Sequence, residues 1–387
     1  MGPDSFWGDL RHGGRETAVG GIQFVDVTRE SGVTFRHTDG SGGRRYIVES
    51  VSAGLALFDF DRDGDIDIYF VNGAPLRGTA ADADASNRLY RNEGNWRFTD
   101  VTARAKVGDR GFGLGVAVGD YDNDGDLDLF VANYLGFTYD KHVQLTSQGI
   151  SIYADPSDFP PMANSLFRNN GNGTFTDVSV ASGVAEHAGW GMGGICADYD
   201  ADGDTDIDVA NDVYANFLFR NDGTGKFEAV ALMAGVAYDA QGGEQASMGV
   251  ECVECIDFDN DGRLDFYQTS YAKELATLHR NLGDGLFADV TLLTGAGTGT
   301  FADVTWGTGL VDFDNDGDRD IFVATGHVQD NIERYDNAAT SATPNVLLLN
   351  QGEGTFVDVS ERSGDGMRGA WRSRGAAFDD LDNDGDV

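Results

Sequence analysis

Short segments in which apolar and polar residues alternate recur along most of the chain. Five of them read IDIYFV, LDLFVA, IDVA, LDFYQT and DIFVA, beginning at Ile66, Leu127, Ile207, Leu264 and Asp320. Successive side chains of a β-strand point to opposite faces, so a period of two among β-branched and aromatic residues predicts strands rather than helices.

A second pattern, N-x-G-x-x-x-F, alternates with these segments. It begins at Asn92, Asn169, Asn221, Asn281 and Asn350. A strand-like stretch such as NRLYR, NSLFR or NFLFR precedes most copies, and FTDVT or a similar stretch follows most of them. Asn and Gly supply the positive φ angles of a tight turn, so each copy predicts a β-hairpin.

A third pattern precedes the alternating segments, and it is the most regular feature of the chain. It reads DFDRDGDID from Asp59, DYDNDGDLD from Asp120, DYDADGDTD from Asp198, DFDNDGRLD from Asp257, DFDNDGDRD from Asp312 and DLDNDGD from Asp380. The glycines of these loops lie 55 to 78 residues apart, and the chain ends inside the sixth loop at Val387. Units of about 60 residues with four short strands predict an all-β fold, a β-propeller in which six repeats are visible.

The loops carry the candidate chemistry. With the first aspartate as position 1, carboxylates at positions 1, 3 and 5 can converge on one ion, the carbonyl of position 7 can add a ligand, and Asp at position 9 can complete the shell. The candidate metal ligands are Asp59, Asp61, Asp63, Asp65, Asp67, Asp120, Asp122, Asp124, Asp126, Asp128, Asp198, Asp200, Asp202, Asp204, Asp206, Asp257, Asp259, Asp261, Arg263 through its backbone, Asp265, Asp312, Asp314, Asp316, Asp318, Asp320, Asp380, Asp382, Asp384 and Asp386. An oxygen-only site favours Ca²⁺ over transition metals, so we expect about five to six calcium ions.

Two other interpretations of the loops fit the sequence less well. An EF-hand needs Glu at position 12 on a helix, whereas Phe70, Val131, Val209, Gln268 and Val323 occupy that position on predicted strands. Solvated turns without a metal would leave four or five carboxylates crowded into nine residues, where they repel one another. The repetition of the loops in one phase of a structural repeat favours metal binding.

The overall charge limits the classes of partner that the chain can bind. Acidic residues outnumber basic ones by 65 to 27, which gives a formal net charge of −38. The chain would repel the phosphate backbone, so nucleic acid is not an expected partner. No run of 18 apolar residues occurs, so we expect no transmembrane segment. Residues 1–21 lack the apolar core of a signal peptide, so no export signal is visible, and we expect this segment to be disordered.

Three cysteines give no disulfide framework. Cys252 and Cys255 form a CxxC pair, but Cys255 and Cys196 share a repeat position with Leu57, Val118, Leu310 and Phe378, which predicts a small core residue. Differences in repeat length fall mainly between the loop and the hairpin, with the insertions at about 135–163 and 328–344. Insertions at one repeat position project from one face, which in repeat proteins is often the binding face.

Five segments of the chain resemble those of known repeat families. They are FVDVTRESGVTFRH, LYRNEG, FGLGVAVGDYDNDGDLDLFVANY, NFLFRNDGTGKFEAVALMAGVAYD and ATGHV. The chain resembles the FG-GAP and VCBS repeats of integrin α-subunit propellers, and more closely the cartilage acidic protein family with its ASPIC/UnbV relatives. The resemblance covers residues 22–387. It implies a calcium-binding propeller, seven-bladed where related folds are known, that is extracellular, on the cell surface or periplasmic. It also implies a C-terminal ASPIC/UnbV domain. Because the sequence stops inside the sixth loop, the propeller is expected to be incomplete at its C-terminus.

Besides a purely structural role, which only partner-binding assays can separate, two functions remain open at this stage. The first is a monomeric adhesion or binding module, not an enzyme, that takes a protein or carbohydrate ligand on the insertion-loop face. The second is an enzyme acting on polysaccharide or another extracellular substrate, with calcium as part of the scaffold. Clustered Arg, His and Tyr near the centre of the ring would favour the enzyme, whereas small apolar residues there would favour the binding module.

Overall fold

The computed structural model describes residues 28–37, 44–49, 54–73, 85–95, 97–109, 111–238, 253–352, 354–364, 366–376 and 378. The predicted disordered segment 1–21, the start of the propeller at residue 22, Cys252 and the sixth loop with Asp380, Asp382, Asp384 and Asp386 lie outside these residues.

Five antiparallel sheets of four strands each form the described molecule, and in each sheet the strands neighbour one another in chain order. The first consists of β1 (Leu55–Phe58), β2 (Asp67–Phe70), β3 (Arg88–Asn92) and β4 (Phe98–Asp100). The second consists of β5 (Gly113–Gly119), β6 (Asp128–Asn133), β10 (Ser165–Asn169) and β11 (Phe175–Asp177). The third consists of β13 (Gly191–Ala197), β14 (Asp206–Asn211), β15 (Phe217–Asn221) and β16 (Phe227–Ala229). The fourth and fifth consist of β17 (Val253–Ile256), β18 (Asp265–Gln268), β19 (Thr277–Gly283) and β20 (Leu286–Asp289), and of β21 (Thr305–Val311), β22 (Asp320–Thr325), β23 (Val346–Asn350) and β24 (Phe356–Asp358).

The remaining elements are short. Two small two-stranded sheets pair β7 (Leu145–Ser147) with β8 (Ile150–Ile152) and β9 (Met162–Ala163) with β12 (Ala188–Gly189). The α-helices are α1 (Thr28–Ser31), α2 (Thr102–Ala105), α3 (Ala231–Ala234) and α4 (Thr291–Thr294). The 3₁₀ turns are η1 (Ile47–Glu49), η2 (Pro156–Asp158), η3 (Val184–Glu186), η4 (Ile332–Arg334) and η5 (Ser360–Arg362). Across the described ranges, every helix falls short of the length and apolarity that a membrane crossing requires.

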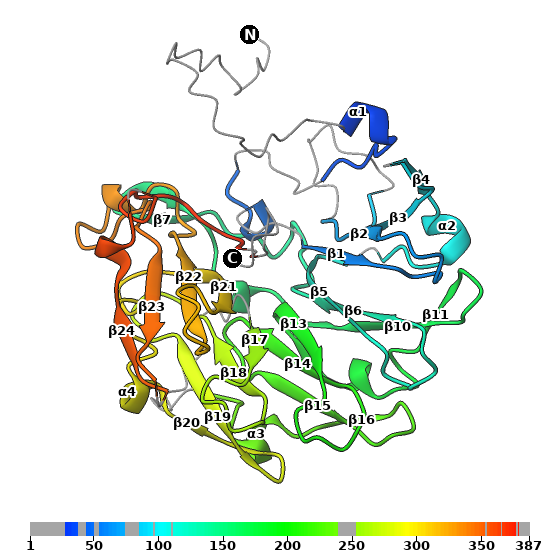
Figure 1. The fold of residues 1–387 in the computed structure, drawn as a ribbon. Coiled ribbons are helices and arrows are strands. Elements are labelled where there is room, and N and C mark those ends of the chain that lie inside the picture. Colours follow the sequence, from blue (N-terminus) through cyan, green and yellow to red (C-terminus); the bar gives the residue numbers. More distant parts are fainter. Residues whose placement is uncertain are drawn as a thin grey trace, which may run out of the picture.

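The sheets are arranged as the blades of a β-propeller, with the first strand of each blade nearest the centre (Figure 1). The predicted fold class is therefore confirmed. The residues that follow each loop form the second strand, and each N-x-G-x-x-x-F pattern joins the third and fourth strands. Because a strand and not a helix follows every described loop, the EF-hand interpretation is excluded by the fold as well.

Glycine lets the innermost strands of neighbouring blades approach each other. A Cβ atom on Gly115 of β5 would lie 2.6 Å from the Cα of Gly193 in β13 and 2.7 Å from the carbonyl oxygen of Met192. Gly307 of β21 similarly faces Gly375, where its N–H donates to the carbonyl of Arg374 at 2.7 Å. Both pairs occupy one repeat position, five residues before the first loop aspartate. At this position the inner strands therefore pack backbone on backbone.

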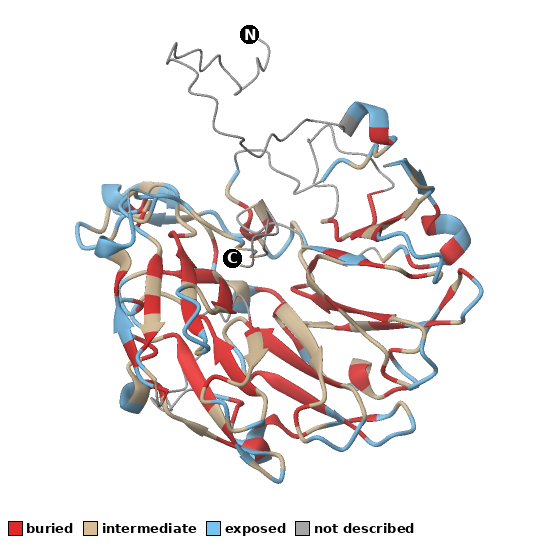
Figure 2. Cartoon of the chain, in the orientation of Figure 1, coloured by how far each residue is buried: buried red, intermediate tan, exposed pale blue. Residues whose placement is uncertain are grey.

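Buried residues lie along the strands of the blades (Figure 2). Their apolar side chains fill the spaces between successive blades. One cluster joins blades one and two, for example through Tyr69 and Leu129, and three similar clusters join the later pairs. Cys196 and Cys255 pack against two of these clusters, as the repeat position predicts. Burial raises the pKa of both thiols to about 12, so they stay protonated and unreactive at neutral pH.

Candidate metal centres

The aspartate-rich loops join the first and second strands of the five blades, over residues 59–66, 120–127, 198–205, 257–264 and 312–319. Each loop reverses its direction at position 6, where the glycine φ lies between 86° and 96°. Residues with a Cβ rarely adopt this conformation, so glycine is required at that point. Position 4 is also left-handed in every loop, with φ of 59° at Arg62 and 55° at Asn123.

This winding brings three carboxylates together in each described loop. Their oxygen atoms lie within 4.8 Å of one another. The groups are Asp59, Asp61 and Asp67; Asp120, Asp122 and Asp128; Asp198, Asp200 and Asp206; Asp257, Asp259 and Asp265; and Asp312, Asp314 and Asp316. Two oxygens bound to one Ca²⁺ at about 2.3–2.6 Å are at most about 5 Å apart. Each group therefore has the spacing that a single ion requires.

The aspartate at position 1 holds the loop around this point. In the first loop the N–H groups of Asp63 and Gly64 donate to the two carboxylate oxygens of Asp59, at 3.2 and 2.9 Å. The same pair of bonds recurs in the other four loops. At position 5, Asp63 accepts the N–H of Asp65 at 2.9 Å. Both positions thus shape the loop through its own amides.

Position 3 provides the strongest indication that these loops bind a cation. The Oδ1 atom of this aspartate is buried and accepts no hydrogen bond from the described chain in four loops, at Asp61, Asp122, Asp200 and Asp259. Burial, the largest cause, raises the pKa of all four carboxyls. A buried carboxylate oxygen without a donor is costly unless a cation meets it. The residues present therefore fit a metal ion.

Position 9 is the most deeply buried carboxylate of each loop. Asp67 accepts the N–H of Phe60 at 3.0 Å and the N–H of Asn92 at 2.7 Å. Equivalent bonds are present at Asp128, Asp206, Asp265 and Asp320. Burial raises the pKa to about 6 at Asp67, to about 7 at Asp128, Asp206 and Asp265, and in the same direction at Asp320. Protons therefore compete with a metal near neutral pH.

The hairpin asparagine clamps each loop to the following blade, a role that the sequence pattern did not reveal. The side-chain amide of Asn169 in blade two donates to the carbonyl of Phe60 in loop one at 2.8 Å. The equivalent bonds, of 2.7, 2.8 and 3.2 Å, join Asn221 to Tyr121, Asn281 to Tyr199 and Asn350 to Phe258. The aromatic ring at position 2 also packs on the hairpin Phe of the next blade, with 6.1 Å between the centroids of Phe60 and Phe175. The asparagine that recurs in all five hairpins is the sequence signal that could have revealed this role.

Neighbouring loops also contact each other directly through positions 4 and 7. Arg62 of loop one forms a 2.9 Å ion pair with Asp126 of loop two. The amide of Asn123 donates to Asp204 at 2.8 Å, and the amide of Asn260 donates to Asp318 at 2.9 Å. The position-7 carboxylates, counted among the candidate ligands, thus lie outside the close three-carboxylate groups, and these three bind the preceding loop.

Loop four differs from the others because two guanidinium groups enter it. Arg280 pairs with Asp259 at 2.7 Å and with Asp261 at 3.2 Å, and Arg263 also pairs with Asp261. Arg263 stands at position 7, where the other four described loops have aspartate. These cations partly neutralise the carboxylates that an ion would bind, so loop four should hold a metal more weakly than the rest.

Arg263→Asp is therefore expected to strengthen metal binding at loop four. The substitution removes one competing cation and restores the residue found at this position elsewhere. We expect about tenfold tighter binding at one site, about 1.4 kcal/mol, measured by calorimetric titration with Ca²⁺. Arg334→Asp, which makes the same charge change outside the loops, is the control. Equal gains in both variants would show that only the net charge matters.

A family profile described as FG-GAP-like repeat matches residues 59–131, 152–209, 198–268, 257–323 and 312–387. Among curated proteins, the chain is 27% identical to cartilage acidic protein 1 of Xenopus tropicalis over 322 residues, covering 70% of this chain and 48% of that protein. It is 29% identical to cartilage acidic protein 1 of Homo sapiens over 295 residues, covering 72% and 39%. The chain thus spans about half the length of these relatives or less.

Solved structures show a weaker likeness. The periplasmic gluconolactonase of Pseudomonas aeruginosa aligns with a TM-score of 0.38 and 16% identity, covering 76% of this chain and 68% of that one. With a TM-score below 0.5, nothing about the function of this chain follows from it.

Proposed function

Because the chain belongs to the family of FG-GAP-like repeat proteins, we propose that it is an extracellular, calcium-binding β-propeller that binds a ligand with its insertion-loop face. The calcium sites would stabilise the blades, and the insertions would supply the contacts to the ligand. The observation that carries the calcium assignment is the buried, unpaired Oδ1 of position 3, which recurs in four blades.

The donor set favours calcium over other ions. Each described group consists of carboxylates alone. Zn²⁺ and copper would prefer His or Cys ligands, and Mg²⁺ usually retains several waters instead of accepting an all-protein shell. Calcium sites of extracellular modules bind at about 10⁻⁴–10⁻³ M. Such sites fill outside cells, which supports the extracellular location that the resemblance implies.

The two predicted insertions lie together, which supports a shared binding face. Tyr153 donates its N–H to the side chain of Gln329 at 3.1 Å. Gln148 donates to the carbonyl of Tyr335 at 2.9 Å, and Asn331 donates to the carbonyl of Ser151 at 3.1 Å. Residues 135–163 of blade two and 328–344 of blade five therefore form one continuous surface.

The contacts of the described residues near the centre of the ring are those of a packed scaffold. The inner strands of blades two and three meet at the backbones of Gly115 and Gly193, and aromatic side chains such as Tyr134 and Trp306 pack in one apolar cluster beside them. His327, one of the two histidines in family-like segments, accepts the N–H of Gln329 at 3.0 Å and packs against Tyr271. These contacts support a structural role for this histidine.

Equilibrium dialysis followed by metal analysis tests the proposal. We expect about five bound Ca²⁺ per chain, or six if the loop from Asp380 also binds, that are retained in excess Mg²⁺. Asp122→Asn should remove about one ion, and Asp158→Asn, an exposed carboxylate outside the loops, should remove none. A chain that holds no calcium at millimolar concentrations, or that exchanges it freely for Mg²⁺, would contradict the proposal.

A further inference from the structure

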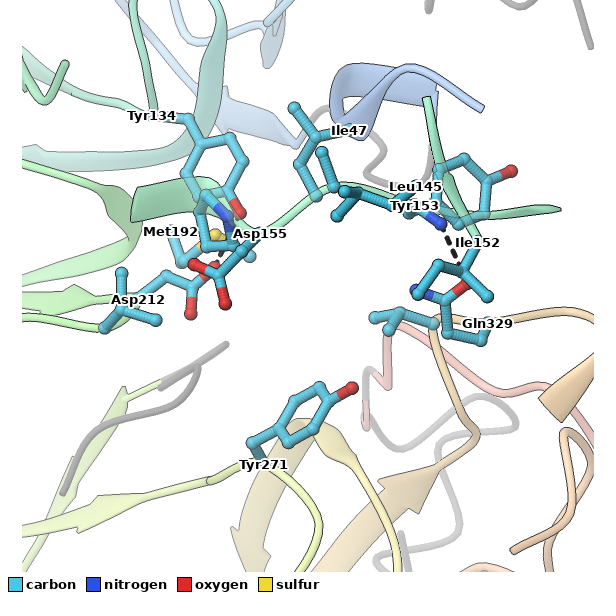
Figure 3. Close-up of a pocket in the computed structure, with 14 residues that line it drawn as sticks. Ile47, Tyr134, Leu145, Ile152, Tyr153, Asp155, Met192, Asp212, Tyr271 and Gln329 are labelled. Carbon is cyan, nitrogen blue, oxygen red and sulfur yellow. Dashed lines mark hydrogen bonds between the residues drawn. The ribbon is translucent and has the colours of Figure 1, made fainter. Parts of the chain in front are cut away.

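A cavity of about 240 Å³ lies at the ends of the second strands that are opposite the metal loops. Figure 3 shows the residues that line it. Its walls include Tyr134, Asp212, Tyr271 and Gln329, which follow the second strands of blades two, three, four and five. The metal loops precede those same strands, so the cavity and the loops lie at opposite ends of them. The insertion of blade two contributes further wall residues, among them Tyr153 and Asp155.

The lining combines apolar and aromatic side chains with two carboxylates. Asp155 and Asp212 are the charged groups among the described residues that form the wall, and no Lys, Arg or His is among them. Figure 3 shows Tyr134, Asp155, Asp212 and Met192 together at one side of the cavity and Tyr271 across from them. The cavity thus presents negative charge and aromatic rings without a counter-ion from its own wall.

The two carboxylates are held in place. The Tyr134 hydroxyl donates to Asp212 at 2.5 Å. Asp155 accepts the N–H of Ser157 at 2.9 Å and its hydroxyl at 2.5 Å, at the start of η2. Burial raises the pKa of Asp212 to about 7; the bond from Tyr134 opposes this shift, and the charge of Asp155 adds to it. The negative charge of Asp212 is therefore unfavourable beside Asp155, and a bound cation would stabilise it.

We propose that this cavity binds an organic cation, with an ammonium group held by Asp155 and Asp212 beside the rings of Tyr134 and Tyr271. Aromatic faces attract ammonium groups, most strongly where water is displaced. The same chemistry already occurs at its edge, because the Arg45 guanidinium lies 5.1 Å from the centroid of Tyr153. The net charge of −38 draws cations toward the whole molecule.

A metal ion and a neutral sugar fit this cavity less well. Ca²⁺ takes six to eight oxygens, whereas most of the wall is apolar, including Ile47, Leu145 and Met192. A sugar would leave many of its hydroxyl groups facing that apolar wall. A second hollow of about 620 Å³, which shares Asp155, Tyr271 and Gln329, gives room for the remainder of a larger ligand.

The assignment rests on the proposed binding role of the insertion-loop face and is independent of the metal at the loops. Calorimetry on the calcium-loaded chain tests it with two probes: choline and its uncharged carbon isostere, 3,3-dimethylbutan-1-ol. We expect one equivalent of choline to bind and the isostere to bind at least about tenfold more weakly, because only choline pairs with the carboxylates. Calcium content is measured on the same sample, so failure here is distinguishable from failure at the metal loops.

Substitution of the two cavity carboxylates tests whether choline binds in this cavity. Asp212→Asn and, separately, Asp155→Asn should each weaken choline binding about tenfold or more. Asp155 is exposed, so its variant tests the site even if Asp212→Asn folds poorly. Asp158→Asn, an exposed carboxylate in the same insertion outside the cavity wall, should leave choline binding unchanged. Equal affinities for the two probes, no choline binding to the calcium-loaded chain, or the loss of one Ca²⁺ in Asp155→Asn would overturn the assignment.

Discussion

Removal of calcium is expected to lower the melting temperature of this protein by about 10 °C or more. At a free concentration ten times the dissociation constant, each site contributes about 1.4 kcal/mol, so five sites together stabilise the fold by about 7 kcal/mol. In a chain of this size each kcal/mol changes the melting temperature by about 2 °C. Differential scanning calorimetry with millimolar Ca²⁺, and then with EDTA, measures the effect. A change below about 2 °C would contradict it.

The decrease in melting temperature on calcium removal should also depend on pH. In the metal-free protein the pKa of Asp128, Asp206 and Asp265 is about 7, well above the ordinary value of about 3.9 for aspartate. Between pH 4 and 7 the folded state therefore holds protons that the unfolded state has released, and the metal-free fold loses stability as the pH rises. Calcium needs the deprotonated groups, so EDTA should destabilise the protein more at pH 8 than at pH 5.5.

Gly115→Ala is expected to cost about 3 kcal/mol, or roughly 6 °C in melting temperature. The added methyl group would lie 2.6 Å from the Cα of Gly193 and 2.7 Å from the carbonyl of Met192. Both contacts are with backbone, so no side-chain rotation can relieve them, and the inner strands of blades two and three would have to separate.

Gly366→Ala is the control for this substitution, because a Cβ there meets no atom within 4 Å. Thermal and urea unfolding of both variants, each loaded with calcium, separates packing from metal binding. If Gly115→Ala melts within about 2 °C of the unmodified chain, the close approach of the two strands is not a constraint on the fold.

The repeated local patterns made the blades predictable from sequence alone. Alternating segments such as that from Ile66, and turns such as that at Asn92, specify strands and hairpins through residues close together in the chain. The same reasoning could place carboxylates in loops and assign position 7 a backbone role, but it could not predict what the position-7 side chains contact. Asp128 is buried beneath its loop, whereas Asp126 pairs with Arg62 of the preceding blade.

The sequence patterns could not predict the contacts between blades. The bond from Asn169 to Phe60 joins residues 109 positions apart, and insertions set such separations without any local signal. The cavity could not be predicted either, because Tyr134, Asp212 and Tyr271 come from three blades and meet only after the ring has formed. Predicting either would have required the relative positions of neighbouring blades, which the motifs of a single repeat do not contain.

Because each clamp joins a hairpin to the preceding loop, a piece that ends at a sheet boundary leaves its last loop without an asparagine partner. A truncation just after Asp177, where the second sheet ends, would keep Asn169 on Phe60 but remove Asn221 from loop two. A truncation after Ala229, where the third sheet ends, would retain Asn221 but leave loop three without Asn281. Domain designers who wish to shorten, permute or recombine this scaffold should therefore treat the last loop retained as unsupported and rely only on the loops before it.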